Sequence, residues 1–243
     1  MSRIINSFNF GLPPYITTAN DYDGTNDFAA HAGDLTGMAD GKEGTLSVLL
    51  RLDGGDGALQ RVFSNQGNRF LFERQADDTF RLRAQTSAAS TLIQVISDTA
   101  YTASSVWLHH LIAWNAATPE AHYFVNDVTD EAAGSIEIDG TIDYTRTAWR
   151  FGATVATGGN KLNGCASEIW FDPTFIDISV LANRRLFIRA DGKPEDLGAT
   201  GQTPTGGPVL VYSKTGDLST NLGTGGNFTI TGALTPCSSN PSD

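Results

Sequence analysis

The chain has 243 residues, of which 40% are hydrophobic and 18% charged, with 26 glycines and 9 prolines. This composition excludes an intrinsically disordered chain and favours many short strands joined by tight turns. The formal net charge of -11 argues against nucleic acid as a partner, because an acidic surface repels phosphate. Cations, neutral glycans and basic protein surfaces remain open as partners.

The N-terminal sequence MSRIINSFNFGLPPYITT contains no apolar run long enough for a signal-peptide core before Pro13 and Pro14. No later segment has the length and apolar character of a membrane span. We therefore expect a chain that is made in the cytoplasm, is not exported by a signal peptide and does not insert into a membrane.

The two cysteines, Cys165 and Cys237, are too few for a disulfide scaffold and have the wrong spacing for a zinc site. Whether they pair is left open, although reduced thiols are expected in a cytosol. If they pair, the closed loop would stabilise the fold by roughly 4 kcal/mol.

Short alternating segments with turns between them follow one another from Asp27 onward, as in a sandwich or barrel. The clearest is 44–52, which predicts a half-buried strand with leucine and valine on one face and Thr45, Ser47 and Arg51 on the other. Segments around 70–72 and 80–84 predict a β-hairpin with its turn at 76–78.

Two further segments, 92–96 and 106–114, are more continuously apolar and predict strands buried on both faces. A helix is predicted to start at Ser179 and to stop at Gly192, with an apolar stripe that packs on the sandwich. The stripe comprises Val180, Leu181, Phe187 and Ile188.

Several segments together resemble a known family. Asp23-Gly-Thr-Asn-Asp-Phe28, Gly44-Thr-Leu-Ser-Val-Leu-Leu-Arg-Leu52 and Trp107-Leu-His-His-Leu-Ile112 resemble, in order, three strands of laminin-G-like domains. Tyr123-Phe-Val-Asn126 and Leu162-Asn-Gly-Cys-Ala-Ser-Glu-Ile-Trp170 are similar to two later strands of that family. The order of the segments carries the resemblance, which covers roughly residues 20 to 190.

This resemblance implies an all-β fold, a two-sheet antiparallel jelly-roll sandwich of the concanavalin A-like type with one short C-terminal helix. The expected division is an N-terminal arm (1–20), the sandwich (21–190) and a C-terminal strand with a Gly/Thr-rich tail (191–243). The tail is expected to pack on the sandwich or on a neighbouring molecule.

A narrower likeness points to tailed-phage structural proteins. It rests on Asp34-Leu-Thr-Gly-Met-Ala-Asp-Gly-Lys-Glu-Gly44, Phe171-Asp-Pro-Thr-Phe-Ile-Asp177, Asn183-Arg-Arg185 and Ala190-Asp-Gly-Lys-Pro194. It implies a non-enzymatic structural or decorating protein of a phage capsid or tail. The implied partners are other virion proteins and further copies of the chain, with a trimer favoured, and a host glycan.

Two alternatives stay beside the virion role, because the fold supports many functions. One is a carbohydrate-binding adhesin that uses the rim loops of the sandwich. The other is a glycoside hydrolase, for which Glu137 and Asp139 have the spacing of paired carboxylates along a strand, with Asp143 as a third. Glu168 and Asp172, which flank Trp170, form a second acidic pair.

Other candidates have ordinary structural explanations, and we assign no catalytic, cofactor-binding or metal-binding residue. His109 and His110 point to opposite faces of a strand, so one is expected in the core and the other partly exposed. No cofactor is predicted, although calcium is compatible with Asp53 and Asp56, or with Asp21, Asp23 and Asn26. The tryptophans could stack on sugars but are more often core residues: Trp107, Trp114, Trp149 and Trp170.

Overall fold

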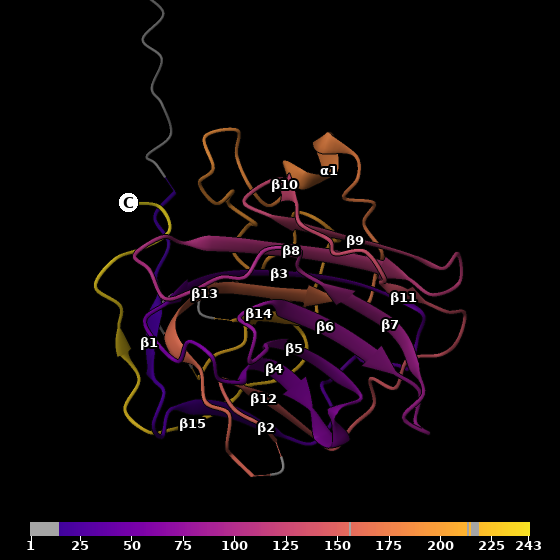
Figure 1. Cartoon of the computed structure of the whole chain (residues 1–243), viewed down its shortest axis with the longest axis horizontal. Coiled ribbons are helices and arrows are strands. Elements are labelled where there is room, and N and C mark those ends of the chain that lie inside the picture. Colours follow the sequence, from indigo (N-terminus) through magenta and orange to yellow (C-terminus); the bar gives the residue numbers. More distant parts are fainter. Residues whose placement is uncertain (1–14, 156, 213, 215–218) are drawn as a thin grey trace, which may run out of the picture.

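The computed structural model describes residues 15–155, 157–212, 214 and 219–243, so most of the predicted N-terminal arm lies outside the described residues. Two antiparallel sheets stack face to face (Figure 1). The first sheet has the order β10 (Val128–Thr129), β9 (Glu120–Val125), β8 (Leu108–Asn115), β3 (Glu43–Leu52), β13 (Asn163–Asp172), β1 (Asn20–Asp23) and β16 (Thr235–Pro236). A further strand, β14 (Leu210–Tyr212), also pairs with β13.

The second sheet has eight strands, all joined by antiparallel pairs. Its order is β11 (Ile136–Glu137), β7 (Thr91–Ile96), β6 (Phe80–Gln85), β5 (Phe70–Arg74), β4 (Gln60–Asn65), β12 (Ala148–Phe151), β2 (Phe28–Ala32) and β15 (Thr229–Thr231). The all-β, two-sheet jelly-roll sandwich predicted from the sequence is therefore confirmed.

The core lies between the two sheets and follows the alternation seen in the sequence. In β3 the inward positions are Leu46, Val48, Leu50 and Leu52, each at most 1% exposed. The predicted hairpin is β5–β6, in which Phe70 and Phe72 pair with Ala84 and Leu82. These strands form because alternate apolar side chains can all be buried on one face of a pleated sheet.

The strand β3 is not half-buried, as its sequence predicts, but buried on both faces. Thr45 is fully buried and Ser47 is 3% exposed, although both lie on the outer face. The reason is a cover formed by residues 173–209, which crosses the outer face of the first sheet. Its apolar contacts with that sheet involve Leu111, Ala113, Trp170, Ile178, Phe187, Leu197 and Val211.

Within the described residues, the structure has one α-helix, α1 (Leu181–Arg184), and one 3-10 turn at Gln66–Asn68. The prediction of a helix from Ser179 to Gly192 is thus too long. The predicted stripe is also wrong at its start, because Val180 is 46% and Leu181 51% exposed. The chain after α1 turns back toward the sheet, and only Phe187 and Ile188 reach the interior. No described helix is long and apolar enough to cross a membrane.

Both histidines of β8 are buried, which corrects the expectation that one is partly exposed. His110 faces the core, where Nδ1 lies 2.7 Å from the Tyr123 hydroxyl, and His109 faces the cover, where Nε2 lies 2.8 Å from the Ser47 hydroxyl. Burial lowers the pKa of His109 to about 4 and that of His110 to about 3. The cover accounts for the difference, since an uncovered outer face would leave His109 in water.

Cys165 and Cys237 form a disulfide with a Cα–Cα distance of 6.1 Å, although reduced thiols were expected. The pairing follows from the register: β1 lies between β13 and β16, with Asp21 opposite both Cys165 and Thr235. Cys237, which immediately follows β16, donates its backbone N–H to the Ala19 carbonyl. The link fixes the C-terminal tail against the first sheet.

Candidate functional site

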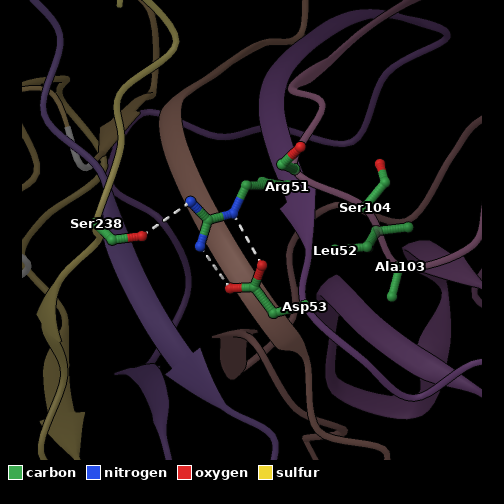
Figure 2. A pocket seen from close by; sticks show the side chains of 7 residues that line it. Arg51, Leu52, Asp53, Ala103, Ser104 and Ser238 are labelled. Atoms are coloured by element: carbon green, nitrogen blue, oxygen red, sulfur yellow. Dashed lines mark hydrogen bonds and ion pairs between the residues drawn. The ribbon is translucent and has the colours of Figure 1, made fainter.

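A cleft of about 450 Å³ opens at the end of β3, on the rim of the sandwich. Three separate segments line it: the end of β3, the loop between β7 and β8, and the C-terminal tail. The lining residues are Arg51, Leu52, Asp53, Ala103, Ser104, Ser105 and Ser238. Figure 2 shows Arg51 and Asp53 between the tail on one side and the loop on the other.

Arg51 and Asp53 form a two-pronged ion pair inside the cleft. The Arg51 Nε and Nη2 atoms each donate to one Asp53 carboxylate oxygen at 2.8 Å. This hydrogen-bonded pairing raises the pKa of Arg51, while partial burial opposes it. A guanidinium and a carboxylate held in one plane offer donors and acceptors side by side.

The tail side of the cleft is held by Arg51. Its Nη1 donates to the Ser239 hydroxyl at 2.7 Å and to the Ser238 hydroxyl at 3.2 Å. Because Cys237 directly precedes these serines, the disulfide places both hydroxyls. Gly164 lets β13 come close here: its φ is 150°, and a Cβ atom would lie 2.1 Å from the Arg51 carbonyl oxygen.

The loop side of the cleft is held by backbone contacts. Ser104 donates its N–H to the Leu52 carbonyl at 2.9 Å, and Ala103 donates its N–H to the Asp56 carboxylate at 2.9 Å. Asp56 in turn accepts from the fully buried Arg74 side chain at 2.6 Å. These contacts hold the loop backbone in place, and with it the exposed hydroxyl groups of Ser104 and Ser105.

Trp107 lies beside the cleft and is the one tryptophan of the four that is not fully buried. Its ring lies 5.9 Å from the Arg51 guanidinium carbon, and its Nε1 donates to the Ser239 hydroxyl at 3.1 Å. The other three are 0% exposed, so they belong to the interior as expected: Trp114, Trp149 and Trp170.

The first pair of candidate calcium ligands, Asp53 and Asp56, is engaged by arginines. Asp53 is held by Arg51 and Asp56 by Arg74. Calcium prefers several oxygen ligands that are free to coordinate it. An arginine on each carboxylate makes this pair a poor donor set for the ion.

The second set of candidate calcium ligands, Asp21, Asp23 and Asn26, does not form one cluster in the structure. The Asp23 carboxylate accepts the backbone N–H groups of Thr25 and Asn26 at 2.7 Å and 3.1 Å, so it closes its own turn. Asp21 instead lies near Asp53, and these two and the Cys165 sulfur have ligand atoms within 4.8 Å of one another. Two carboxylates beside a disulfide sulfur and Arg51 do not form the oxygen-rich shell that calcium prefers.

The carboxylates considered for hydrolysis are not gathered around the cleft. Asp139 pairs with Lys42 at 2.7 Å, and the buried Asp143 pairs with Arg146. Glu137 is half-buried in β11, where burial and the nearby Glu131 raise its pKa. Asp139 and Asp143 are thus engaged in ion pairs, whereas Glu137 has a raised pKa and lies apart from the cleft.

The acidic pair around Trp170 is also separate from the cleft. Asp172 accepts a hydrogen bond from the Thr205 hydroxyl at 3.1 Å. Glu168 lies in a β-bulge of β13 with a φ of 45°, is 4% exposed and accepts a hydrogen bond from the Tyr15 hydroxyl. Burial raises the pKa of Glu168 to about 8, although the nearby Lys214 lowers it in part.

Sequence reasoning named Asp53 but missed Arg51, Ser104 and Ser238 as members of one site. No local pattern could have joined them, because they are far apart in the chain. The useful signal was the cysteine pair, since a Cys165–Cys237 link brings the tail to β13.

The strand order and the two stacked antiparallel sheets define a concanavalin A-like jelly-roll domain. No family model matches the chain, and no curated protein matches it either. Several solved structures, by contrast, are similar to this chain in fold.

One similar structure is described as a "putative carbohydrate binding protein" from Bacteroides ovatus, with a TM-score of 0.65 and 14% identity over 93% of this chain. The chain spans 60% of the length of that protein. A heptameric SAP-like pentraxin from Limulus polyphemus has a TM-score of 0.60 and 12% identity, over 93% of this chain and 96% of that one.

Domains LG4-5 of the mouse laminin α1 chain align with a TM-score of 0.47 and 12% identity, over 69% of this chain and 45% of that one. The TM-score of this laminin alignment is too low to support an argument about the chain. At such identities the first two establish the fold alone.

Proposed function

We propose that this chain is a carbohydrate-binding domain that holds a sugar in the rim cleft at the end of β3. The observation that carries the proposal is the planar Arg51–Asp53 pair with the hydroxyls of Ser104 and Ser238 on either side. Sugar hydroxyls both donate and accept, so neighbouring hydroxyls on one ring match a guanidinium and a carboxylate held side by side.

The surroundings of the cleft favour the same ligand class. Binding sites combine an apolar surface with a few fixed polar groups, and the half-buried Trp107 provides an apolar ring next to the polar ones. The Bacteroides ovatus protein with the same fold is described as binding carbohydrate, which supports this choice among the many functions of the fold. We propose a binding role without catalysis, because Asp139, Asp143, Asp172 and Glu168 have structural partners, which leaves Glu137 without a second free carboxylate among these candidates.

The predicted virion role has less support than the glycan-binding alternative. Neither the Bacteroides ovatus nor the Limulus protein comes from a phage. Contacts within this chain also hold the tail: Ser242 contacts Thr17, and Lys193 donates to the Ser242 carbonyl at 2.7 Å. Location on a phage particle, virion partners and a homotrimer stay predictions from the sequence.

A disulfide favours a site of action outside a reducing cytosol, because cytosolic thiols are kept reduced. We therefore propose that the domain meets its glycan in an oxidising, extracellular setting.

A glycan array with the oxidised chain, read with calcium and with EDTA, tests the proposal. We expect a defined set of glycans to bind. Asp53→Asn should weaken binding to a hit by about tenfold, since it removes one charged acceptor from the cleft. Asp191→Asn is the matched control, because Asp191 pairs with Arg189 on the surface and should leave affinity unchanged.

An array without hits under either condition would contradict the proposed function. Equal binding by the Asp53→Asn variant and the parent would contradict the site. Loss of binding in EDTA would show that calcium takes part, against the donor set described above.

A further inference from the structure

The outer face of the second sheet carries two rows of mostly polar residues that pair in register. Its centre is buried, since Ser64, Leu71 and Glu73 are at most 1% exposed, whereas Arg83 and Arg150 are half-buried at its two ends. The register places Arg150 opposite Ser64, Ser64 opposite Leu71, and Leu71 opposite Arg83. A second row runs from Arg61 through Glu73 to Arg81. Residues that pair in register lie on the same face, and the alternate residues Phe70, Phe72, Phe80 and Leu82 fill the core.

This face is positively charged on a chain whose net charge is -11. The two rows contain four arginines and one acidic residue, Glu73, and all their residues are described. Glu73 pairs with Arg61 at 2.8 Å and with Arg81. Arg83 and Arg150 have no acidic partner among the described residues, and Lys161 lies at the Arg150 end, where both cations contact the Phe28 ring.

Several donors on this face have no hydrogen-bond partner within the described chain. They are Nε of Arg61, Arg83 and Arg150, and the hydroxyl of Ser64. Ser64 is fully buried and Arg61 is 4% exposed, so bulk water does not satisfy these groups freely. These atoms lie below the surface, so a ligand on this face would contact the half-buried Arg83 and Arg150 side chains through their terminal nitrogens.

Burial lowers the pKa values of Arg61, Arg83 and Arg150. Repulsion by Arg81 lowers the pKa of Arg83 further, and Arg83 and Arg81 do the same to Arg61, while Glu73 opposes the shift in both. The arginines therefore crowd one another, and a negative ligand would relieve the repulsion.

We propose that this face, which we call the arginine face, is a second binding site and takes an acidic glycan by its carboxylate or sulfate groups. Guanidinium groups hold such planar or tetrahedral oxyanions with paired hydrogen bonds. Arg150 and Arg83 are three strand spacings apart, about 14 Å, which suits two or three sugar residues. The proposal is independent of the rim cleft, where Arg51 already has an acidic partner.

The charge distribution favours a short acidic glycan over nucleic acid. The four arginines of the two rows lie on the strands β4, β5, β6 and β12, with Lys161 at the Arg150 end, and the rest of the chain carries the excess of acidic residues. A long phosphate backbone would run beyond the positive area and meet repulsion.

Affinity measurements on the full oxidised chain test this site with short fragments of about two to four sugars, from heparin as a sulfated probe, polygalacturonate as a carboxylated probe and dextran as a neutral one. We expect both acidic probes to bind, more weakly as salt rises, and the dextran fragment not to bind. Arg83→Gln and Arg150→Gln should each weaken binding about tenfold, and the double variant about a hundredfold.

The matched control is the double variant Lys42→Gln with Arg189→Gln, which removes the same charge from surface ion pairs elsewhere and should bind within about twofold of the parent. Arg150→Gln alone serves if the double variant does not fold, since Arg150 is only half-buried. Asp53→Asn should leave binding of the acidic fragments intact, which separates this site from the rim cleft.

Equal losses in the arginine variants and the control would overturn the proposal, because net charge alone would then explain binding. Single-stranded DNA that binds as tightly as the heparin fragment, with the same dependence on Arg83 and Arg150, would overturn the choice of a glycan. Binding of the acidic fragments that Asp53→Asn abolishes would move the site to the rim cleft and also overturn it.

Discussion

The outer faces of the two sheets differ, although both are made of antiparallel strands with the same alternation. The first sheet presents Leu111, Ala113 and Trp170 outward, and residues 173–209 cover them. The second sheet presents Arg83 and Arg150 outward, and both of these side chains are half-buried. An apolar outer face requires a cover, whereas a face of long cationic side chains can remain in water and be used for binding.

Removal of the central contact beneath the cover should have the largest effect. Trp170 is fully buried, contacts Phe187 edge-on and donates its Nε1–H to the Gly201 carbonyl at 2.9 Å. We expect Trp170→Ala to lower the free energy of unfolding by about 4 kcal/mol, as for other large buried side chains. Urea unfolding followed by circular dichroism measures the change.

A substitution on the outer face of the second sheet provides the contrast for that experiment. Arg83→Gln should change the free energy of unfolding by less than about 0.5 kcal/mol, because Arg83 has no acidic partner to lose. Similar losses in both variants would show that the two faces contribute alike to stability, which would remove the distinction drawn here.

The disulfide should have the next largest effect, because it fastens the tail on the side of the first sheet. The cysteines are 72 positions apart, and closing such a loop stabilises a fold by up to roughly 4 kcal/mol. We expect the double variant Cys165→Ser with Cys237→Ser to unfold at lower urea concentration and to bind glycan at the rim cleft more weakly. Binding of the acidic fragments at the arginine face is the internal control and should persist once the variant is folded.

The buried Glu168 should make the free energy of unfolding depend on pH, with a smaller effect than loss of the disulfide. Its pKa is about 8 in the folded state and near 4.5 when unfolded, so the folded state holds one more proton between these values. Stability from this group is therefore complete below pH 4.5 and lost as the pH rises through 8. From pH 7 to pH 9 the loss should be about 1 kcal/mol.

Unfolding curves of the parent and Glu168→Gln at several pH values check this sign. The variant should show no such loss above pH 7, because Gln does not titrate. His109 and His110 do not interfere in this range, since their lowered pKa values affect stability below about pH 6.5. A parent curve that rises with pH above 7 would contradict the protonated state of Glu168.

The sequence was sufficient to predict the sandwich, because alternation within single strands such as β3 and the β5–β6 hairpin is local information. It was insufficient for the cover. Thr45, Ser47 and His109 have polar side chains that suggest solvent, and only the path of residues 173–209 buries them. The helix prediction failed for the same reason, since contacts with the sheet determine where α1 ends.

The two candidate sites depend even more on pairing between distant strands. Asp53 was named from the sequence as a candidate calcium ligand, but the other residues of the cleft, Arg51, Ser104 and Ser238, are brought to it by strand, loop and disulfide contacts. In the sequence, Arg81 and Arg83 lie in the predicted hairpin, and Arg61 and Arg150 lie in other segments. Their grouping requires the register from β12 through β4 and β5 to β6, which no single segment encodes.

The lateral borders of both sheets end in very short strands. The outermost ones, β10, β16 and β11, have two residues each, and β15 has three. Such borders offer few free backbone groups to a strand from another molecule, which protects a β-rich chain from growing into aggregates by edge addition. Copies of this domain that associate would therefore do so through side-chain surfaces, and the sandwich can work at high local concentration without fusing into continuous sheets.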